Sequence, residues 1–137
     1  MADMLDMAPN LMDAVIQTES NWKGDAYNKK SGATGLGQIT PIALEDFNTL
    51  KKEKLTMADM KDPQKNMYVT DWTLNYRIPA MLRTYKIPLT IDNVLTAYNF
   101  GIGNLKKGKA LPAETISYIK KVKKNMESMA KSQVGGM

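Results

Sequence analysis

A chain of 137 residues with ordinary apolar content has the length for one folded domain with one hydrophobic core. It contains no cysteine and no histidine, which excludes a disulfide framework, metal ligation by thiolate or imidazole, and acid–base catalysis by histidine. The net charge of +5 favours an anionic partner, although the lysines also suit a solvated helix face.

The first expected helix begins after Asn10, a residue type that caps helix N-termini well. Leu11, Val15 and Glu19 are spaced i, i+4 and i+8, so they lie on one helix face. Burial and the negative end of the helix dipole both raise the pKa of a carboxyl at the C-terminal end of such an apolar stripe. Glu19 is therefore predicted to keep its proton near neutral pH, as a general acid must, unless it is a solvated glutamate at a helix end.

A polar segment over residues 21–31 leads into a turn with three glycines, Gly32, Gly35 and Gly37. This density of glycine indicates a tight backbone or the close approach of a ligand. The turn lacks the Gly-Lys-Ser/Thr ending of a phosphate-binding P-loop. We expect a short strand over residues 36–39.

The later helices have recognisable start and stop signals. We expect starts at Thr40-Pro41, Asp62-Pro63, Thr90 and Pro112, a short turn capped by Thr56, an interruption near Pro79, and a helix end at Gly101. Residues 1–131 are expected to form a single domain, and residues 132–137 a flexible tail.

Three short blocks follow one another along the chain. They are ESNW with SGATGLGQITP (residues 19–22 and 31–41), AYNFG (97–101) and LPAETISYI (111–119), and the segment 62–66 is a weaker fourth. Together they resemble the signature of the soluble lytic transglycosylases, the SLT family, which is related in fold to goose-type lysozyme. The resemblance spans about Leu11 to Val122. It implies an α+β fold, predominantly α: a lysozyme-like single domain with a small β element next to the active-site cleft.

The resemblance also implies an activity. A family member is a lyase that cleaves the β-1,4 bond between N-acetylmuramic acid and N-acetylglucosamine in peptidoglycan, leaving 1,6-anhydromuramic ends. One catalytic glutamate, matched here by Glu19, acts as acid and then as base, with no metal and no other cofactor. Substrate-binding roles are implied for Gln38, Tyr98, Asn99, Glu114 and Tyr118, with Asn28 and Thr40 as weaker candidates. The family usually has Met where Gly37 stands, so one wall of the substrate groove is expected to differ.

Three alternative functions stay open. A muramidase on the same fold would use water as the nucleophile, and Asp25 or Glu114 would be the first candidate for its base. A non-catalytic wall-binding virion module would keep the fold without the chemistry. A nucleic-acid-binding protein would use the late lysines of segments 106–109 and 120–124, but aromatic residues do not alternate with them, so we expect no nucleic-acid partner.

The expected partners are peptidoglycan glycan strands. No segment approaches a membrane span in length, and the N-terminus has neither the basic nor the long apolar region of a secretory signal. We therefore expect synthesis in the cytoplasm without a signal peptide and action at the cell wall, periplasmic or extracellular. The expected context is a bacteriophage virion or a secretion system, whose components would be further partners.

Overall fold

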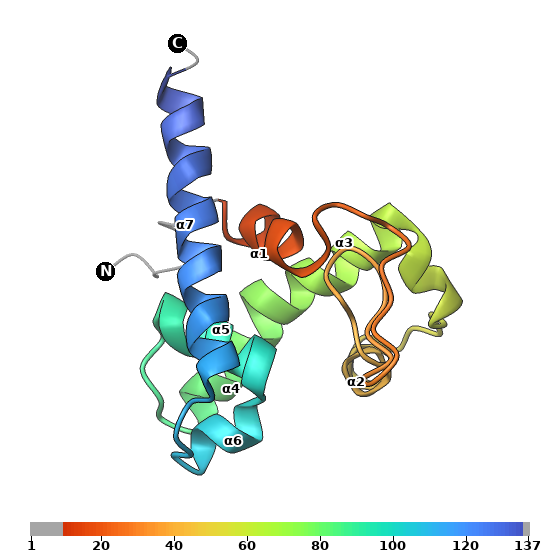
Figure 1. Cartoon of the computed structure of the whole chain (residues 1–137). Coiled ribbons are helices and arrows are strands. Elements are labelled where there is room, and N and C mark those ends of the chain that lie inside the picture. The colour runs from red at the N-terminus through yellow and green to blue at the C-terminus, as the bar shows by residue number, and fades with distance from the viewer. Residues whose placement is uncertain (1–9, 136–137) are drawn as a thin grey trace. The chain divides into compact units, whose positions relative to one another are not determined.

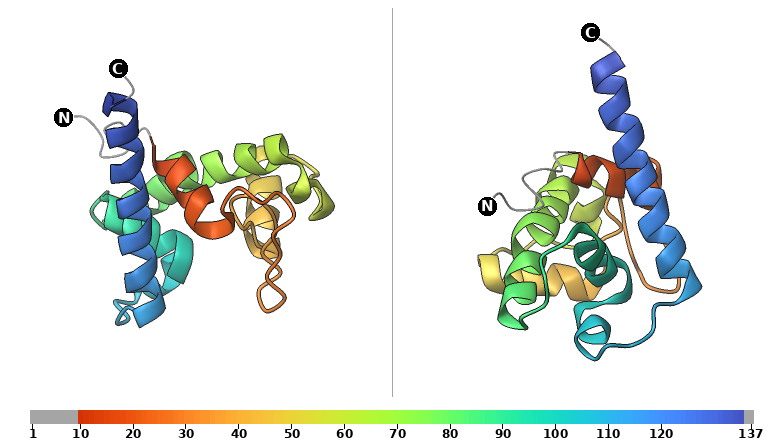
Figure 2. Two further views of the ribbon diagram at one scale, coloured as in Figure 1. Left: turned by 45° about the horizontal axis from the view of Figure 1, so that its top comes forward. Right: turned by 90° about the vertical axis from the view of Figure 1, so that its left-hand side faces the viewer.

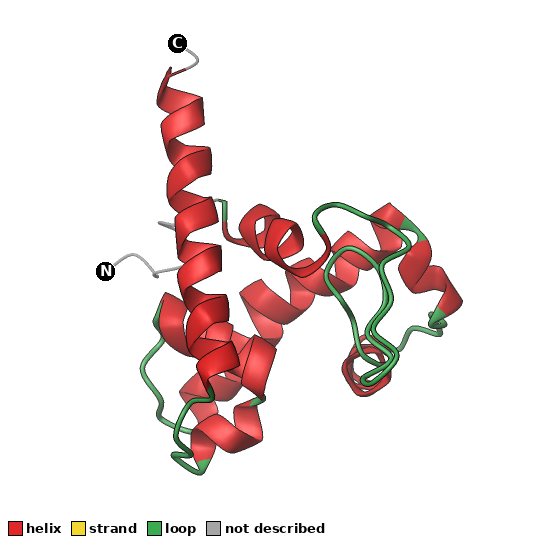
Figure 3. Ribbon diagram, viewed as in Figure 1, coloured by secondary structure: helices red, strands yellow, loops and turns green. Residues whose placement is uncertain are grey.

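The computed structural model describes residues 10–135, and these are predominantly helical (Figures 1 and 3). The elements in chain order are α1 (Leu11–Ser20), α2 (Pro41–Lys51), the 3-10 turn η1 (Ala58–Lys61), α3 (Pro63–Trp72), the π-helical turn η2 (Thr73–Arg77), α4 (Ile78–Thr84), α5 (Ile91–Phe100), α6 (Ile102–Lys106) and α7 (Ala113–Gly135). Among these described helices, none is both long and apolar enough to cross a membrane.

The described residues divide into two compact units. Unit 2 consists of residues 15–73, and unit 1 combines residues 10–14 with residues 74–135. The single domain over residues 1–131 stays a prediction. Helix α7 continues through Gly135, so the backbone of residues 132–135 is helical, whereas residues 136–137 of the expected tail lie outside the described part.

The predicted helix starts are confirmed, and three of them have a local side-chain cap. Three side-chain oxygens accept a hydrogen bond from a backbone N–H three residues ahead: Thr40 from Ala43 (3.2 Å), Asp62 from Lys65 (2.9 Å) and Thr90 from Asn93 (3.1 Å). Pro41 and Pro63 follow the first two caps, where a missing N–H costs nothing.

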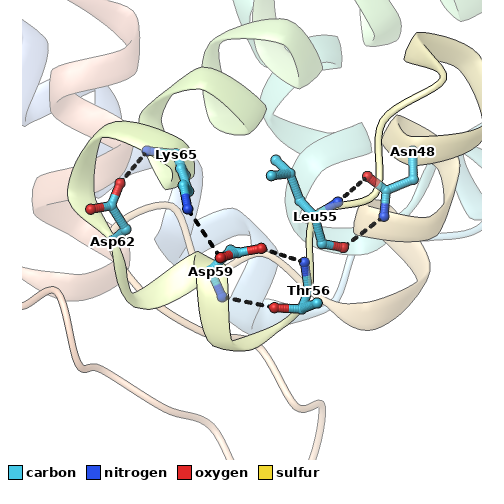
Figure 4. Close-up of polar contacts among 6 residues, drawn as sticks. All are labelled: Asn48, Leu55, Thr56, Asp59, Asp62 and Lys65. Carbon is cyan, nitrogen blue, oxygen red and sulfur yellow. Dashed lines mark hydrogen bonds and ion pairs between the residues drawn. The ribbon is translucent and has the colours of Figure 1, made fainter.

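The chain between α2 and α3 is fixed by two short-range polar pairs (Figure 4). Asn48 on α2 exchanges two hydrogen bonds with the backbone of Leu55, at 2.8 and 3.1 Å. Thr56 and Asp59 bond each other's backbone N–H reciprocally, like a capping box. The bond from the Thr56 N–H, and then the neighbouring Lys65, hold the pKa of the Asp59 carboxyl below its usual value of 3.8.

The apolar core of unit 2 lies between the turn after the glycines, α2, η1 and α3. Its buried members are Ile39, Leu44, Phe47, Met60 and Val69. The Phe47 ring also meets two aromatic rings of α3 edge to face, those of Tyr68 at 5.5 Å and Trp72 at 5.2 Å between centroids. These contacts hold α2 against α3 and so fix the loop that precedes α2.

In unit 1, helix α5 packs against α4, α6 and α7. Two polar contacts show that α5 and α7 run antiparallel. Asp92, near the start of α5, meets Lys123 at 2.7 Å, and Asn99, near its end, meets Thr115 in the first turn of α7 at 2.9 Å. The face of α7 toward the core is an apolar stripe that includes Tyr118, Ile119 and Val122.

The helical segment between residues 63 and 84 is interrupted as predicted. The π-helical turn Thr73–Arg77 separates α3 from α4, and Pro79 is the second residue of α4. Because proline has no N–H and its ring clashes with the carbonyl four residues earlier, an ordinary α-helical ladder cannot pass through it.

The expected strand over residues 36–39 is wrong. Within residues 10–135 the extended pairing is limited to two isolated antiparallel bridges, Tyr27 with Thr34 and Thr34 with Ile39. Gly35 and Gln38 have φ angles of 78° and 54°, and the Gln38 N–H donates to the Gly35 carbonyl. Two left-handed residues among four convert the segment into a turn. The predominantly α part of the prediction holds, and the described residues show no small β element beyond these two bridges.

Candidate active site

Glu19 is the penultimate residue of α1, and its side chain is half-buried. Leu11 and Val15 are 2% and 0% exposed, so the predicted apolar stripe leading to Glu19 is confirmed. The next residue, Ser20, is also buried, and its hydroxyl donates to the Ile16 carbonyl at 3.0 Å. This bond holds the Ser20 hydroxyl against its own helix.

The chain leaves α1 through two consecutive residues in the left-handed region. Asn21 has a φ of 52° and Trp22 a φ of 63°. For residues other than glycine, each such conformation costs on the order of 1–3 kcal/mol and persists only where the surroundings impose it. The sharp exit turns the chain away from the helix axis directly after Glu19, and residues 21–40 then double back as an irregular loop (Figure 2).

Gln38 is the best-defined polar side chain at the end of that loop. It is half-buried, and its amide nitrogen donates to the carbonyls of Ala26 (3.1 Å) and Gly35 (3.0 Å). Because two carbonyls surround the same end of the amide, the orientation of the group is fixed. Both amide hydrogens are then used by the loop, so the hydrogen-bonding capacity that Gln38 can offer a ligand is the acceptor oxygen Oε1.

Asn66 on α3 holds this loop in place through hydrogen bonds that involve both its amide nitrogen and its amide oxygen. It is 0% exposed. Its amide nitrogen donates to the carbonyls of Thr34 (3.0 Å) and Met60 (2.8 Å), and its amide oxygen accepts from the Gly37 N–H (2.9 Å) and the Thr70 hydroxyl (3.0 Å). One buried side chain thus ties together the glycine-rich turn, the end of η1 and α3.

Gly37 lies directly against Thr70. A Cβ atom built on Gly37 would overlap the Thr70 hydroxyl oxygen and would come within 2.9 Å of its methyl and 3.0 Å of its Cβ. Rotating the threonine exchanges one of these contacts for another, so the position has no room for a side chain. The space that a larger residue would need at position 37 is therefore filled by Thr70, on the neighbouring helix.

We expect Gly37→Met to destabilise unit 2 by about 1–3 kcal/mol, as overpacking of a filled site usually does. In a Thr70→Gly background the same substitution should cost less, since the colliding atoms are gone. Thermal unfolding of the two single variants and the double variant measures this coupling. Gly103→Ala is the control, because nothing lies within 4 Å of a Cβ there and the variant should be at least as stable as the wild type. Additive effects of the two changes would contradict the contact.

The two weaker candidates in unit 2 have local structural partners. Asn28 is exposed, and its side-chain oxygen accepts from the backbone N–H groups of Lys30 (2.9 Å) and Ser31 (3.3 Å), which shapes the loop. Thr40 is half-buried and caps α2. Substrate roles for both stay predictions.

The remaining predicted residues belong to unit 1. Tyr98 and Asn99 are half-buried near the end of α5, and the Asn99 amide oxygen accepts from the Thr115 hydroxyl at 2.9 Å. This bond brings Asn99 beside the first turn of α7, which carries Glu114 with an exposed side chain. Tyr118 is one turn further along α7 and is 7% exposed. Their contacts with substrate stay predictions.

Asn66 and Thr70 were not predicted as site residues. The weak match at residues 62–66 includes Asn66 without giving it a role. The available signal was an Asn and a Thr spaced i, i+4, and therefore on one face of an expected helix, because buried polar side chains are retained where they bond another segment. As for metals, no group of three or more acidic side chains is arranged to hold an ion in the described residues, and metal-independent activity stays a prediction.

Comparison with known proteins identifies the family of the chain. The model of the transglycosylase SLT domain family matches residues 1–125. The chain is 27% identical over 127 residues to a protein of Pasteurella multocida (strain Pm70) named membrane-bound lytic murein transglycosylase F. That match covers 90% of this chain and 24% of the relative, so the chain spans about a quarter of that protein's length. No solved structure matches the chain. Because the family model matches nearly all of it, the chain belongs to the transglycosylase SLT domain family.

Proposed function

We propose that this chain is a peptidoglycan lytic transglycosylase in which Glu19 is the catalytic acid and base. The observation that carries the proposal is the position of Glu19, half-buried at the end of an apolar helix stripe and directly before a strained turn, in a chain of the SLT family. The lytic murein transglycosylase from Pasteurella multocida, 27% identical, supports the same substrate and reaction.

The proposed reaction needs a single carboxyl group. Glu19 donates its proton to the oxygen that bridges the two sugars, and the bond from that oxygen to C1 of N-acetylmuramic acid breaks. The N-acetyl group of the same sugar supports the positive charge at C1. The Glu19 carboxylate then takes the proton of the C6 hydroxyl as O6 bonds to C1, which regenerates the acid and closes the 1,6-anhydro ring without water.

The remaining side chains would bind and orient the glycan. Gln38 has its amide hydrogens bonded within the loop, so we assign its Oε1 as acceptor for a substrate N–H or hydroxyl. Asn99 has its oxygen bonded to Thr115, so its amide hydrogens would be the donors to the sugar. Tyr98 would hydrogen-bond the N-acetyl group. Glu114 and Tyr118 would contact the glycan further along, with Asn28 and Thr40 at the edge of the site.

The mass of the products tests the reaction. Digestion of purified cell walls should release muropeptides one water lighter than hydrolysis products and without reducing muramic ends, and it should proceed equally well with a metal chelator present. The same digestion in water labelled with heavy oxygen is the control, because a lyase incorporates no label at C1. Reducing ends carrying the label would instead make this protein a muramidase. In that case Asp25 and Glu114 would be the first candidates for the base that activates water.

The proposed place of action is the cell wall. A bacteriophage virion or a secretion system is the context that we propose for it, since both must open peptidoglycan locally. Detection of this chain in purified virions or secretion complexes would test that context independently of its activity.

A further inference from the structure

The net positive charge of the described residues lies in one of the two units. Residues 10–14 and 74–135 contain eleven Lys and Arg residues and four Asp and Glu residues, which gives a net charge of +7. Residues 15–73 contain eight basic and eight acidic residues, so their net charge is zero. The candidate acid Glu19 thus belongs to a neutral unit, and a separate basic unit accounts for the excess charge.

Three of these eleven basic residues lie along one side of α7. Lys120, Lys124 and Lys131 are spaced i, i+4 and i+11, so they fall on one line along the helix, and all three are exposed. At 1.5 Å per residue that line is about 16 Å long. The buried residues Thr115, Tyr118 and Val122 lie on the opposite side, against the core of unit 1. The last turns of α7 extend beyond the other helices of unit 1 (Figures 1 and 2). We call the line of Lys120, Lys124 and Lys131 the lysine face.

Three of the eight lysines of α6, α7 and the loop between them have a partner within the described residues. Lys123 pairs with Asp92, Lys131 pairs with Glu127 on the surface, and Lys106 stacks over the Tyr85 ring at 4.3 Å. In contrast, Lys107, Lys109, Lys120, Lys121 and Lys124 are exposed and form no ion pair or hydrogen bond through their side chains within the described residues. Uncompensated like charges at this density repel one another, and an external polyanion relieves that repulsion.

We propose that the lysine face is a docking surface for the peptide carboxylates of peptidoglycan. The proposal rests on the proposed function, because these carboxylates are attached to the glycan that Glu19 would cleave. Lys120 and Lys124 carry uncompensated charge one turn apart, and Lys131 continues the line with a charge that it shares with Glu127. Such a line fits a polymer with repeated anionic groups better than a single small anion. Lysines are mobile point charges, and α6, α7 and the loop between them contain no arginine for fixed bidentate contacts. The aromatic residue of α7, Tyr118, is buried and offers no stacking surface to bases.

Binding to purified walls tests the proposal separately from catalysis. Binding is measured by sedimentation at several salt concentrations, in the full chain carrying Glu19→Gln so that the walls stay intact. The test variant is Lys120→Gln with Lys124→Gln. The control is Lys54→Gln with Lys61→Gln, which removes the same charge from two exposed positions of unit 2. We expect the test variant to bind walls about three- to tenfold more weakly at low salt, with a shallower salt dependence, and the control to bind like its parent.

A second arm identifies the anion. Walls whose carboxylates have been converted to neutral amides should bind the parent and the test variant equally weakly. Equal losses in the test and control variants, or no loss in either, would overturn the docking surface. Loss of binding only after removal of phosphodiester polymers, or tighter binding of duplex DNA than of walls at the same salt, would overturn the carboxylate assignment. Product analysis on short soluble glycans decides the proposed reaction independently, since those substrates do not need the lysine face.

Discussion

Replacing Glu19 by glutamine is expected to abolish wall clearing, with a loss of at least about a hundredfold, because glutamine keeps the shape of the side chain but cannot transfer a proton. The unfolding temperature should stay the same or rise slightly, since a half-buried ionisable group is replaced by a neutral one. Turbidity loss of wall suspensions and thermal unfolding measure the two effects on the same preparation.

Asp25→Asn is the matched control for that experiment. Asp25 is in the loop that follows Glu19, its side chain is exposed, and its carboxylate forms no hydrogen bond within the described residues. We expect the variant to keep substantial activity. Near wild-type activity in Glu19→Gln would remove the assignment of the acid. A large loss in both variants would point to two cooperating carboxylates and hence to hydrolysis.

The second large effect is expected at Asn66, where alanine should destabilise the protein by on the order of 3–5 kcal/mol. The substitution removes the four hydrogen bonds of the buried Asn66 side chain, to Thr34, Met60, Gly37 and Thr70, and each such bond contributes about 0.5–1.5 kcal/mol. The same bonds hold the turn that carries Gln38. We therefore expect reduced activity even at temperatures well below the unfolding temperature of the variant.

Asn48→Ala provides the comparison for Asn66→Ala. Asn48 also bonds a backbone N–H and a backbone C=O, but it is half-buried, so water can replace the lost side chain. We expect a cost of about 1 kcal/mol there and no specific loss of activity. Chemical denaturation of both variants gives the two free energies. Equal costs at Asn48 and Asn66 would show that the buried network contributes no more than an ordinary loop contact.

The parts of the fold that could be predicted depend on neighbours within a few residues. Caps such as Thr40 and Asp62 bond an N–H three positions away, so their sequence signals are complete in themselves. The same holds for the interruption before Pro79 and for the apolar stripe of α1. The strand over residues 36–39 failed because its apolar residues were considered without the backbone angles that Gly35 and Gln38 adopt.

The candidate site was only partly predictable for the same reason. Glu19 and Gln38 became candidates because the family motif includes them, and Glu19 also because it ends the apolar stripe of its helix. The bonds from Asn66 to Gly37 and to Thr34 join residues 29 and 32 positions apart, and no local pattern reports such a pairing. The hydrogen bond from the Thr115 hydroxyl to the Asn99 amide oxygen depends on the antiparallel contact between α5 and α7. The sequence does not specify that contact.

The contact between Gly37 and Thr70 constrains the order in which this sequence can change during evolution. A lineage starting from the present pair cannot gain a large residue at position 37 first, because Thr70 occupies the space. It must first lose bulk at position 70, and that intermediate carries a cavity until the second substitution fills it. The two positions should therefore vary together among related chains, with a large residue at one accompanied by a small residue at the other, and the fitness effect of either change should depend on the state of its partner.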